Sequence, residues 1–147
     1  MVELKQRVLF LNKIHLFNSL KEDQLSGIAF KMEEYAFPAE TVIFERGDKP
    51  NGFYLIYKGR VKVTRQSEKG GEDFLAFLTA GDYFGEEALF ENRNRSARIT
   101  TQEDSILFFL SREEFDKLLA QYEKLKPNFL VAIKSRKLAR ATRFKWL

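Results

Sequence analysis

Glycine residues divide the middle of this chain into short segments of alternating apolar and polar residues, and this pattern restricts the fold more than any other. Alternation with a period of two is typical of a strand that buries one face, and glycines between such runs are typical of tight turns. Short strands with a turn about every ten residues predict an antiparallel roll or sandwich. The dividing glycines are Gly47, Gly52, Gly59, Gly70, Gly71 and Gly81, and the expected strands are Thr41–Glu45, Phe53–Tyr57, Arg60–Thr64, Phe74–Thr79, Ser96–Thr101 and Ser105–Leu110.

Helices are expected before these strands. Val2–Ile14 carries apolar residues at near-helical spacing, which predicts a first helix. Ser19 is followed three residues later by Glu22, the pattern of a capping box, in which each of the two side chains accepts from a backbone N–H at the start of a helix. A second helix is therefore expected to begin there and to continue to about Met32.

Helices are also expected after the strands. Ser111 and Glu114 repeat the capping-box pattern and predict a helix that ends near Tyr122. Pro127 suits the first position of a helix, where no backbone donor is needed, so a final helix is expected from there toward Phe144.

The length of 147 residues indicates a single domain, and 44% apolar residues with 15 Phe are enough for a substantial core. We predict an α+β fold, mainly β: an antiparallel, jelly-roll-like β-roll of about eight strands flanked by N-terminal and C-terminal helices. The expected parts are N-terminal helices over 1–34, the roll over 35–110 and C-terminal helices over 111–147.

Charge is distributed unevenly along the chain. After Glu123 there are eight basic residues and no acidic one, which leaves 17 of the 25 basic residues against 21 acidic ones in the rest. A basic segment at one end indicates an interaction tail or a contact face for another domain. Because the sequence stops at Trp146 and Leu147, we expect a longer protein truncated before an effector domain.

Several classes of protein are excluded by composition. The chain has no cysteine and one histidine, His15, so we expect neither a metal site nor nucleophilic or general-base catalysis. The longest apolar runs are too short to cross a bilayer, and the N-terminus does not have the pattern of a signal peptide. The expected protein is a cytoplasmic non-enzyme, or a cytoplasmic part of a larger or membrane-associated protein.

The segment Phe84–Ile99, FGEEALFENRNRSARI, gathers groups that suit a small anion. Gly85 lacks a Cβ, so backbone can approach a ligand closely there. Glu86–Phe90 is expected to form one helical turn, whose free N–H groups and dipole favour a phosphate. Arg95 offers charge-assisted donors, and Ser96 adds a hydroxyl. The carboxylate of Glu86 needs a hydrogen-bond donor, such as a hydroxyl, whereas the other groups suit an anion. Together they predict a ligand that has a phosphate next to a sugar hydroxyl.

This segment resembles the phosphate-binding cassette of the cyclic nucleotide-binding domain family, of the catabolite-activator and protein-kinase-A regulatory-subunit type. The family pattern is roughly F-G-E-apolar-A-L, a few residues, then P-R-x-A-x-V. Upstream, Ile43–Val63 is similar to the family's paired strands, and Leu16, Phe17 and Leu20 are similar to the apolar start of its N-terminal helical segment. Asn94 stands where the family often has proline, as in bacterial members that share the R-S-A after it. The matching residues are Phe84, Gly85, Glu86, Ala88, Leu89, Arg95, Ala97 and Ile99.

The resemblance implies roles for particular residues. In the family the glutamate accepts from the ribose 2′-hydroxyl and the arginine pairs with the cyclic phosphate, which implies these roles for Glu86 and Arg95. Ser96 is expected to contact the phosphate, and in such domains a Ser here also reaches the amino group of a syn guanine. Glu87 is expected to face solvent, because a second carboxylate pointing inward would repel a phosphate. The ligand-binding candidates are Phe84, Gly85, Glu86, Glu87, Ala88, Arg95 and Ser96.

The base is harder to assign. By alignment with the family, Val63 and Leu75 line the pocket for the base. The alternative, to which we give equal weight, is that both are ordinary residues of the hydrophobic core. In the family the final helix closes over the base, and Arg140 or Phe144 would stack on it, against the alternative of a solvated basic helix.

The sequence thus predicts a regulatory module that binds a cyclic nucleotide, with cyclic AMP favoured and cyclic GMP the second choice, and that signals by movement of its C-terminal helix. The nucleotide is the expected ligand, with no catalytic cofactor. The expected partner is an effector domain or protein that contacts that helix, and one alternative places this contact at a membrane. A further alternative is a homodimer, in which the partner is a second copy of the chain. Sequence-specific nucleic-acid binding is not expected, because no helix-turn-helix unit fits in the chain. The rival interpretation is a degenerate, ligand-free module that docks a membrane or protein partner through its basic helix.

Overall fold

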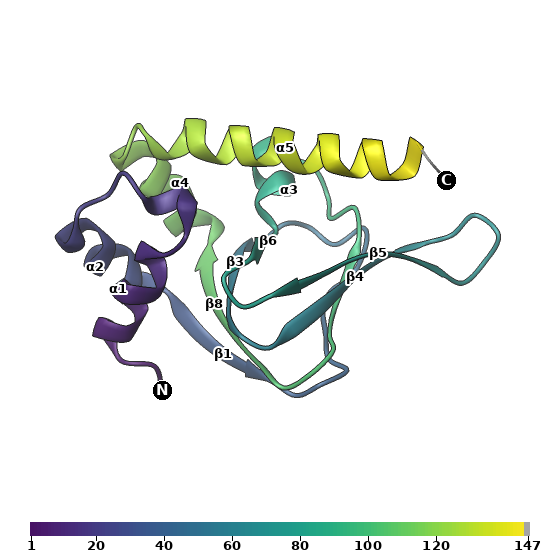
Figure 1. Ribbon diagram of the computed structural model, residues 1–147, viewed down its shortest axis with the longest axis horizontal. Coiled ribbons are helices and arrows are strands. Elements are labelled where there is room, and N and C mark those ends of the chain that lie inside the picture. The colour runs from purple at the N-terminus through teal and green to yellow at the C-terminus, as the bar shows by residue number, and fades with distance from the viewer. Residues whose placement is uncertain (146–147) are drawn as a thin grey trace.

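The computed structural model describes the backbone of residues 1–145 and the side chains of residues 1–140. Two antiparallel sheets of four strands each form a β-roll, with helices at its N-terminal and C-terminal sides (Figure 1). The predicted fold class is confirmed. The strands are β1 (Glu33–Phe37), β2 (Val42–Phe44), β3 (Gly52–Lys58), β4 (Arg60–Gln66), β5 (Glu72–Thr79), β6 (Tyr83–Phe84), β7 (Arg98–Thr101) and β8 (Ser105–Ser111). The helices are α1 (Leu4–Asn12), the 3-10 helix η1 (His15–Phe17), α2 (Glu22–Lys31), α3 (Glu86–Glu91), α4 (Arg112–Gln121) and α5 (Leu125–Lys145).

The order of strands determines where the two sheets meet the cassette. One sheet has the order β1-β8-β3-β6, and the other has the order β2-β7-β4-β5. The short strand β6 pairs with β3, with Phe84 opposite Tyr54, and this register brings Gly85 close to Gly52. The cassette therefore begins at the edge of the first sheet and returns as β7 into the second sheet.

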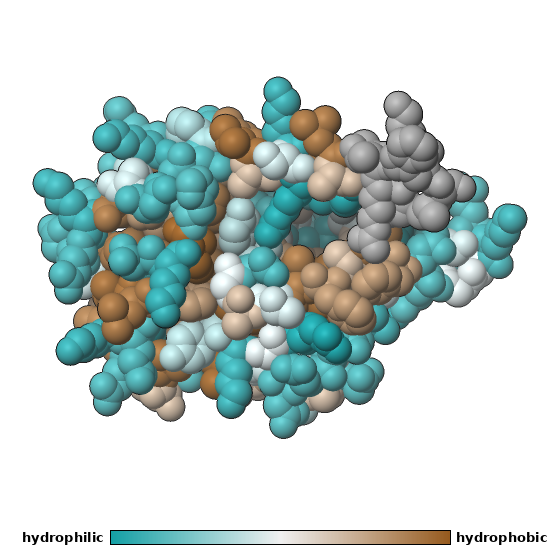
Figure 2. Space-filling model, viewed as in Figure 1, coloured by the Kyte–Doolittle hydropathy of each residue, from teal (hydrophilic) through white to brown (hydrophobic). Residues whose placement is uncertain are grey.

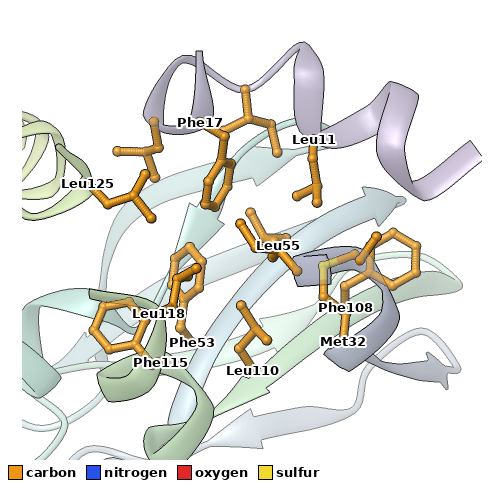
Figure 3. Close-up of a cluster of buried hydrophobic side chains, with 14 of the residues drawn as sticks. Leu11, Phe17, Met32, Phe53, Leu55, Phe108, Leu110, Phe115, Leu118 and Leu125 are labelled. Atoms are coloured by element: carbon orange, nitrogen blue, oxygen red, sulfur yellow. The ribbon is translucent and has the colours of Figure 1, made fainter. Parts of the chain in front are cut away.

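The larger hydrophobic core lies between the first sheet and the helices (Figure 3). Phe53 of β3 contacts Phe115 of α4 and Phe129 of α5, with ring centroids 5.6 and 5.4 Å apart. Leu125, Phe129 and Ile133 repeat at four-residue spacing along α5 and are all buried. Burying each such side chain contributes about 1.5–3 kcal/mol, so the N-terminal half of α5 is anchored on the roll. In Figure 1 the rest of α5 extends past α3.

Several expected element boundaries are wrong. Ser19 does not cap a helix: the turn from Phe17 to Leu20 closes first (N···O 3.1 Å), and α2 begins only at Glu22. The roll begins at Glu33 instead of residue 35, and the strand β1 was not predicted from the sequence. The two-residue strand β6 was not predicted either. The final helix begins at Leu125, not at Pro127.

The helix cap at Ser111 is confirmed, since its hydroxyl accepts from the backbone N–H of Glu114, which is one of the two hydrogen bonds of a capping box. Of the helices within residues 1–145, none has the length and apolar character needed to cross a membrane.

Candidate functional site

Gly85 occupies a backbone conformation that a side chain would strain. Its φ is +96°, and an added Cβ would lie 3.0 Å from Nη1 of Arg95 and 3.1 Å from the carbonyl oxygen of Gly52. The close approach expected at this position is therefore made by the protein's own arginine and backbone. Gly85 thus sets the path of the chain into α3 and makes room for Arg95.

Arg95 is buried and has no carboxylate partner among the described side chains. Its guanidinium donates from Nη1 to the carbonyl oxygen of Gly85 (2.6 Å), and from Nη2 to that of Gly52 (2.8 Å) and to Asn51 Oδ1 (3.1 Å). It also lies over the ring of Phe44, 4.2 Å from the centroid. Burial lowers the pKa of this guanidinium from its ordinary value. Its buried Nε has no hydrogen-bond partner among the described residues.

Glu86, the first residue of α3, is 1% exposed and has two differently placed oxygens. Its Oε1 accepts from Nη1 of Arg136 on α5 at 2.9 Å, whereas Oε2 has no partner among the described residues. Burial raises the pKa of this carboxyl, and Arg136 opposes that rise. A buried carboxylate with one free oxygen is an acceptor that still lacks a donor.

Glu87 does not face solvent, which corrects the expectation from sequence. Its Oε1 accepts from Nη2 of Arg140 at 2.8 Å, and its Oε2 lies 3.9 Å from Nη2 of Arg93. The prediction considered only repulsion from a phosphate, and the cations of α5 and of the cassette loop reverse that argument.

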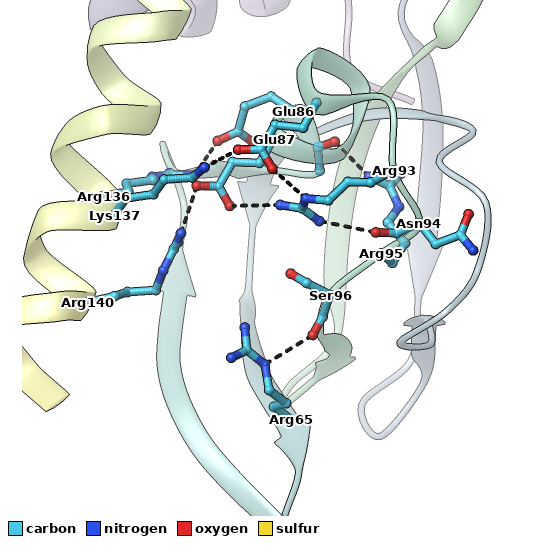
Figure 4. Close-up of polar contacts among 12 residues, drawn as sticks. Arg65, Glu86, Glu87, Arg93, Asn94, Arg95, Ser96, Arg136, Lys137 and Arg140 are labelled. Carbon is cyan, nitrogen blue, oxygen red and sulfur yellow. Dashed lines mark hydrogen bonds and ion pairs between the residues drawn. The ribbon is translucent and has the colours of Figure 1, made fainter.

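The helix α5 is joined to α3 by three ion pairs, and Figure 4 shows their side chains extending from α5 toward the carboxylates. Arg136 pairs with Glu86, Arg140 with Glu87, and Lys137 with Glu91. Sequence reasoning assigned no role to Arg136. The one signal in the sequence was the excess of basic residues after Glu123 beside an acidic cassette.

A cavity of about 300 Å³ lies beside these groups, between the cassette, the second sheet and α5. Figure 2 shows the face on which it opens below α5, hydrophilic inside and hydrophobic along its lower edge. All of the candidate ligand-binding and base-pocket residues line it, and Arg140 contributes from α5. Phe144 lies outside the residues whose side chains are described. The lining residues are Phe44, Val63, Arg65, Leu75, Ala76, Leu78, Phe84, Gly85, Glu86, Glu87, Ala88, Arg93, Arg95, Ser96, Ala97, Ile99, Arg136, Ala139 and Arg140.

Comparison with known proteins identifies related sequences and folds. A profile described as "Cyclic nucleotide-binding domain" matches residues 34–122. The cGMP-dependent protein kinase egl-4 of Caenorhabditis elegans is 36% identical over 122 residues, which cover 82% of this chain and 16% of the kinase. A cAMP-dependent protein kinase regulatory subunit from Emericella nidulans is 31% identical over 116 residues, 79% of this chain and 27% of that protein. The chain thus spans only 16% of the length of the egl-4 kinase.

Solved structures agree on the fold. The catabolite activator protein of Thermus thermophilus has a TM-score of 0.77 at 31% identity, over 86% of this chain and 59% of that one. The regulatory domain of Toxoplasma gondii PKA, crystallised with cAMP, has a TM-score of 0.79 at 21% identity, over 91% of this chain and 50% of that one, and shows similarity of fold alone.

Proposed function

The chain belongs to the cyclic nucleotide-binding domain family, and we propose that the cavity beside α3 binds a cyclic nucleotide. One observation carries the proposal. Arg95 Nε is a donor and Glu86 Oε2 an acceptor, and both are buried atoms of cavity-lining residues without a partner among the described residues. Buried polar groups are nearly always hydrogen-bonded, so a donor and an acceptor beside one cavity call for a ligand with both kinds of group. A cyclic phosphate and a ribose 2′-hydroxyl supply them.

In this arrangement the phosphate lies at the Arg95 and Ser96 end of the cavity. Arg95 has a buried charge that is paired with no carboxylate among residues 1–140, and a phosphate would provide the missing counter-charge. The ribose hydroxyl donates to Glu86. The base then extends over the apolar part of the cavity, where Val63 and Leu75 line it.

The identity of the purine is a separate part of the proposal. The R-S-A sequence after Asn94 favours cyclic AMP by resemblance to bacterial members of the family. The similar kinases include both a cGMP-dependent enzyme and a cAMP-dependent regulatory subunit, so cyclic GMP is tested beside cyclic AMP.

We further propose that α5 carries the signal to an effector, because it contacts the residue that binds the ribose. The two oxygens of Glu86 have different roles: Oε1 accepts from Arg136, and Oε2 is left for the ligand. A donor on Oε2 stabilises the charged carboxylate, and a charged carboxylate binds Arg136 more strongly. Ligand binding and docking of α5 therefore support each other, and the coupling is reciprocal.

The rival function, a ligand-free docking module that uses its basic helix, is weakened by the same contacts. Three of the eight basic residues after Glu123, namely Arg136, Lys137 and Arg140, are each paired with a carboxylate of α3 and are therefore less available for docking. The domain is a regulatory module and not catalytic by itself; the effector it would control is part of the proposal.

Calorimetric titration of nucleotide-free protein with cyclic AMP and cyclic GMP tests the function. We expect micromolar or tighter binding of one of them. Arg136→Ala should weaken that binding severalfold and increase hydrogen exchange along α5, since it removes the pair between α5 and Glu86. Arg98→Ala is the control, because its partners are Glu45 and Glu72 and it does not line the cavity. No binding of either nucleotide would refute the proposal and favour the docking module.

A further inference from the structure

Arg65 of β4 lines the same cavity and has no part in the arrangement described so far. Its side chain is exposed, and its Nε donates to the backbone carbonyl oxygen of Ser96 at 3.2 Å. Figure 4 shows the guanidinium pointing from β4 toward the space below Glu87 and Arg140, beside Ser96. Arg65 therefore lies at the end of the cavity where the phosphate is proposed to bind.

The other arginines that line the cavity are already engaged. Arg93, Arg136 and Arg140 pair with carboxylates. Arg95 uses three of its five N–H donors for oxygens of the protein, one from Nη1 and two from Nη2, which leaves Nε and one N–H of Nη1 for a ligand. By contrast, the two amino groups of Arg65 have no hydrogen-bond or ion-pair partner among the described residues.

A cyclic phosphate carries its negative charge on two exocyclic oxygens. Arg95 has two N–H donors left for charge-assisted hydrogen bonds, and the Ser96 hydroxyl gives one neutral bond. A phosphate bound by these two groups alone would keep acceptor sites open on the side of β4. A guanidinium suits such sites, because it presents paired donors in the geometry of phosphate oxygens.

We propose that Arg65 is a second phosphate-binding residue, whose amino groups donate to an exocyclic oxygen of the cyclic phosphate. This inference rests on the proposed function. Arg95 supplies the buried contact, and Arg65 supplies the contact from the exposed side. The bond from Arg65 Nε to the Ser96 carbonyl holds the guanidinium beside the cassette, so little side-chain entropy is lost when the ligand binds.

A competing role for Arg65 would be recognition of the base. An arginine donates well to the O6 and N7 acceptors of guanine, whereas adenine presents an amino donor beside N7. A base contact would favour cyclic GMP alone. A phosphate contact would serve both nucleotides equally, because they share the same cyclic phosphate.

The test is the affinity of Arg65→Ala and Arg65→Lys for cyclic AMP and cyclic GMP at low and high salt. Lys62→Ala is the control, since it removes a positive charge from the same strand but does not line the cavity. We expect Arg65→Ala to weaken both nucleotides by about tenfold, and by less at high salt because the contact is partly exposed. Arg65→Lys should lose about threefold or less, since the charge remains.

Five outcomes overturn the inference. Unchanged affinity in Arg65→Ala, or an equal loss in Lys62→Ala, would show that no specific contact exists. A loss confined to cyclic GMP would assign Arg65 to the base. A loss in Arg65→Lys as large as in Arg65→Ala, unchanged by salt, would assign it the structural role of holding the Ser96 carbonyl. If the wild-type chain binds neither nucleotide, the proposed function fails and this inference fails with it.

Discussion

Replacing Arg95 by alanine tests the site at the residue on which it depends most. The change removes the hydrogen bonds to the carbonyl oxygens of Gly85 and Gly52 and to Asn51. Hydrogen bonds from a charged group contribute about 1.5–3 kcal/mol each, and the carbonyl groups left behind lose their partner. The variant is also relieved of a buried cation, whose desolvation offsets part of this loss. We therefore expect the unliganded protein to lose about 2–4 kcal/mol of stability.

The effect on ligand binding is expected to be at least as large. Removing one member of a buried charge pair costs about 2–5 kcal/mol, which corresponds to a roughly 30-fold to several-thousand-fold weaker Kd. Arg95→Lys keeps the charge, but its compact ammonium lacks the planar fork of donors with which the guanidinium reaches both carbonyl groups and a ligand. Its affinity should lie between those of wild type and Arg95→Ala.

Two measurements on the same samples separate binding from folding. Calorimetric titration gives Kd, and thermal unfolding with and without saturating nucleotide gives the stability and its ligand-dependent gain. A loss of affinity below tenfold in an Arg95→Ala protein that remains folded would refute the reasoning. So would an equal loss in Arg98→Ala, whose guanidinium does not line the cavity.

The remaining predictions concern the start of α3 and one helix cap. Gly85→Ala should cost about 1–3 kcal/mol of stability and displace Arg95. Gly81→Ala is the control, because its backbone is equally strained (φ +92°) but the added Cβ meets no atom of the described residues within 4 Å, its chain neighbours apart. Thermal unfolding and nucleotide titration of both variants should show lost binding in Gly85→Ala alone. Glu86→Gln should weaken nucleotide binding about tenfold or more, while leaving the unliganded protein as stable as wild type or up to about 1 kcal/mol more stable. Burial raises the pKa of Glu86 above 4.5, so the protonated carboxyl stabilises the folded wild-type protein at acidic pH, and this stabilisation is lost as the pH rises through the folded-state pKa. Glutamine does not titrate, so the stability of Glu86→Gln relative to wild type, measured by denaturant unfolding, should increase from pH 4 to pH 7. Ser111→Ala should cost about 1 kcal/mol in the same assay, since it removes the acceptor for the N–H of Glu114, and should not change nucleotide affinity.

The sequence was a good guide where the determinants are local. The glycine turns, the strand alternation and the Ser111 cap depend on a few neighbouring residues, and the structure has these elements close to the expected positions. The cassette is one continuous stretch, so its glycine, glutamate and arginine were recognisable by spacing. Their convergence on one cavity follows from the return of the chain into β7.

The errors occur where distant contacts decide. The strand β1 begins with Glu33 and Glu34 and has only weak alternation, and its pairing with β8 makes it a strand. Ser19 has the capping pattern, but the turn after Phe17 delays the helix. Nothing in the local sequence relates Glu87 to Arg140, which lies 53 positions later in the chain. The prediction that the Glu87 side chain points into solvent was therefore wrong.

The basic segment and the acidic start of α3 are two parts of one electrostatic arrangement. A phosphate site next to the carboxylates of Glu86 and Glu87 is unfavourable unless cations neutralise them. Five arginines and two glutamates line the cavity, a formal charge of +3 that falls to +1 without Arg136 and Arg140 of α5. At separations of a few Å in a partly buried site, such a difference changes the energy of an anion by several kcal/mol. An anion should therefore bind tightly only while α5 is docked, and its binding should in turn hold α5 in place. Under the proposed function, Arg136, Lys137 and Arg140 would act within the domain as the counter-charge that makes an acidic helix compatible with an anionic ligand.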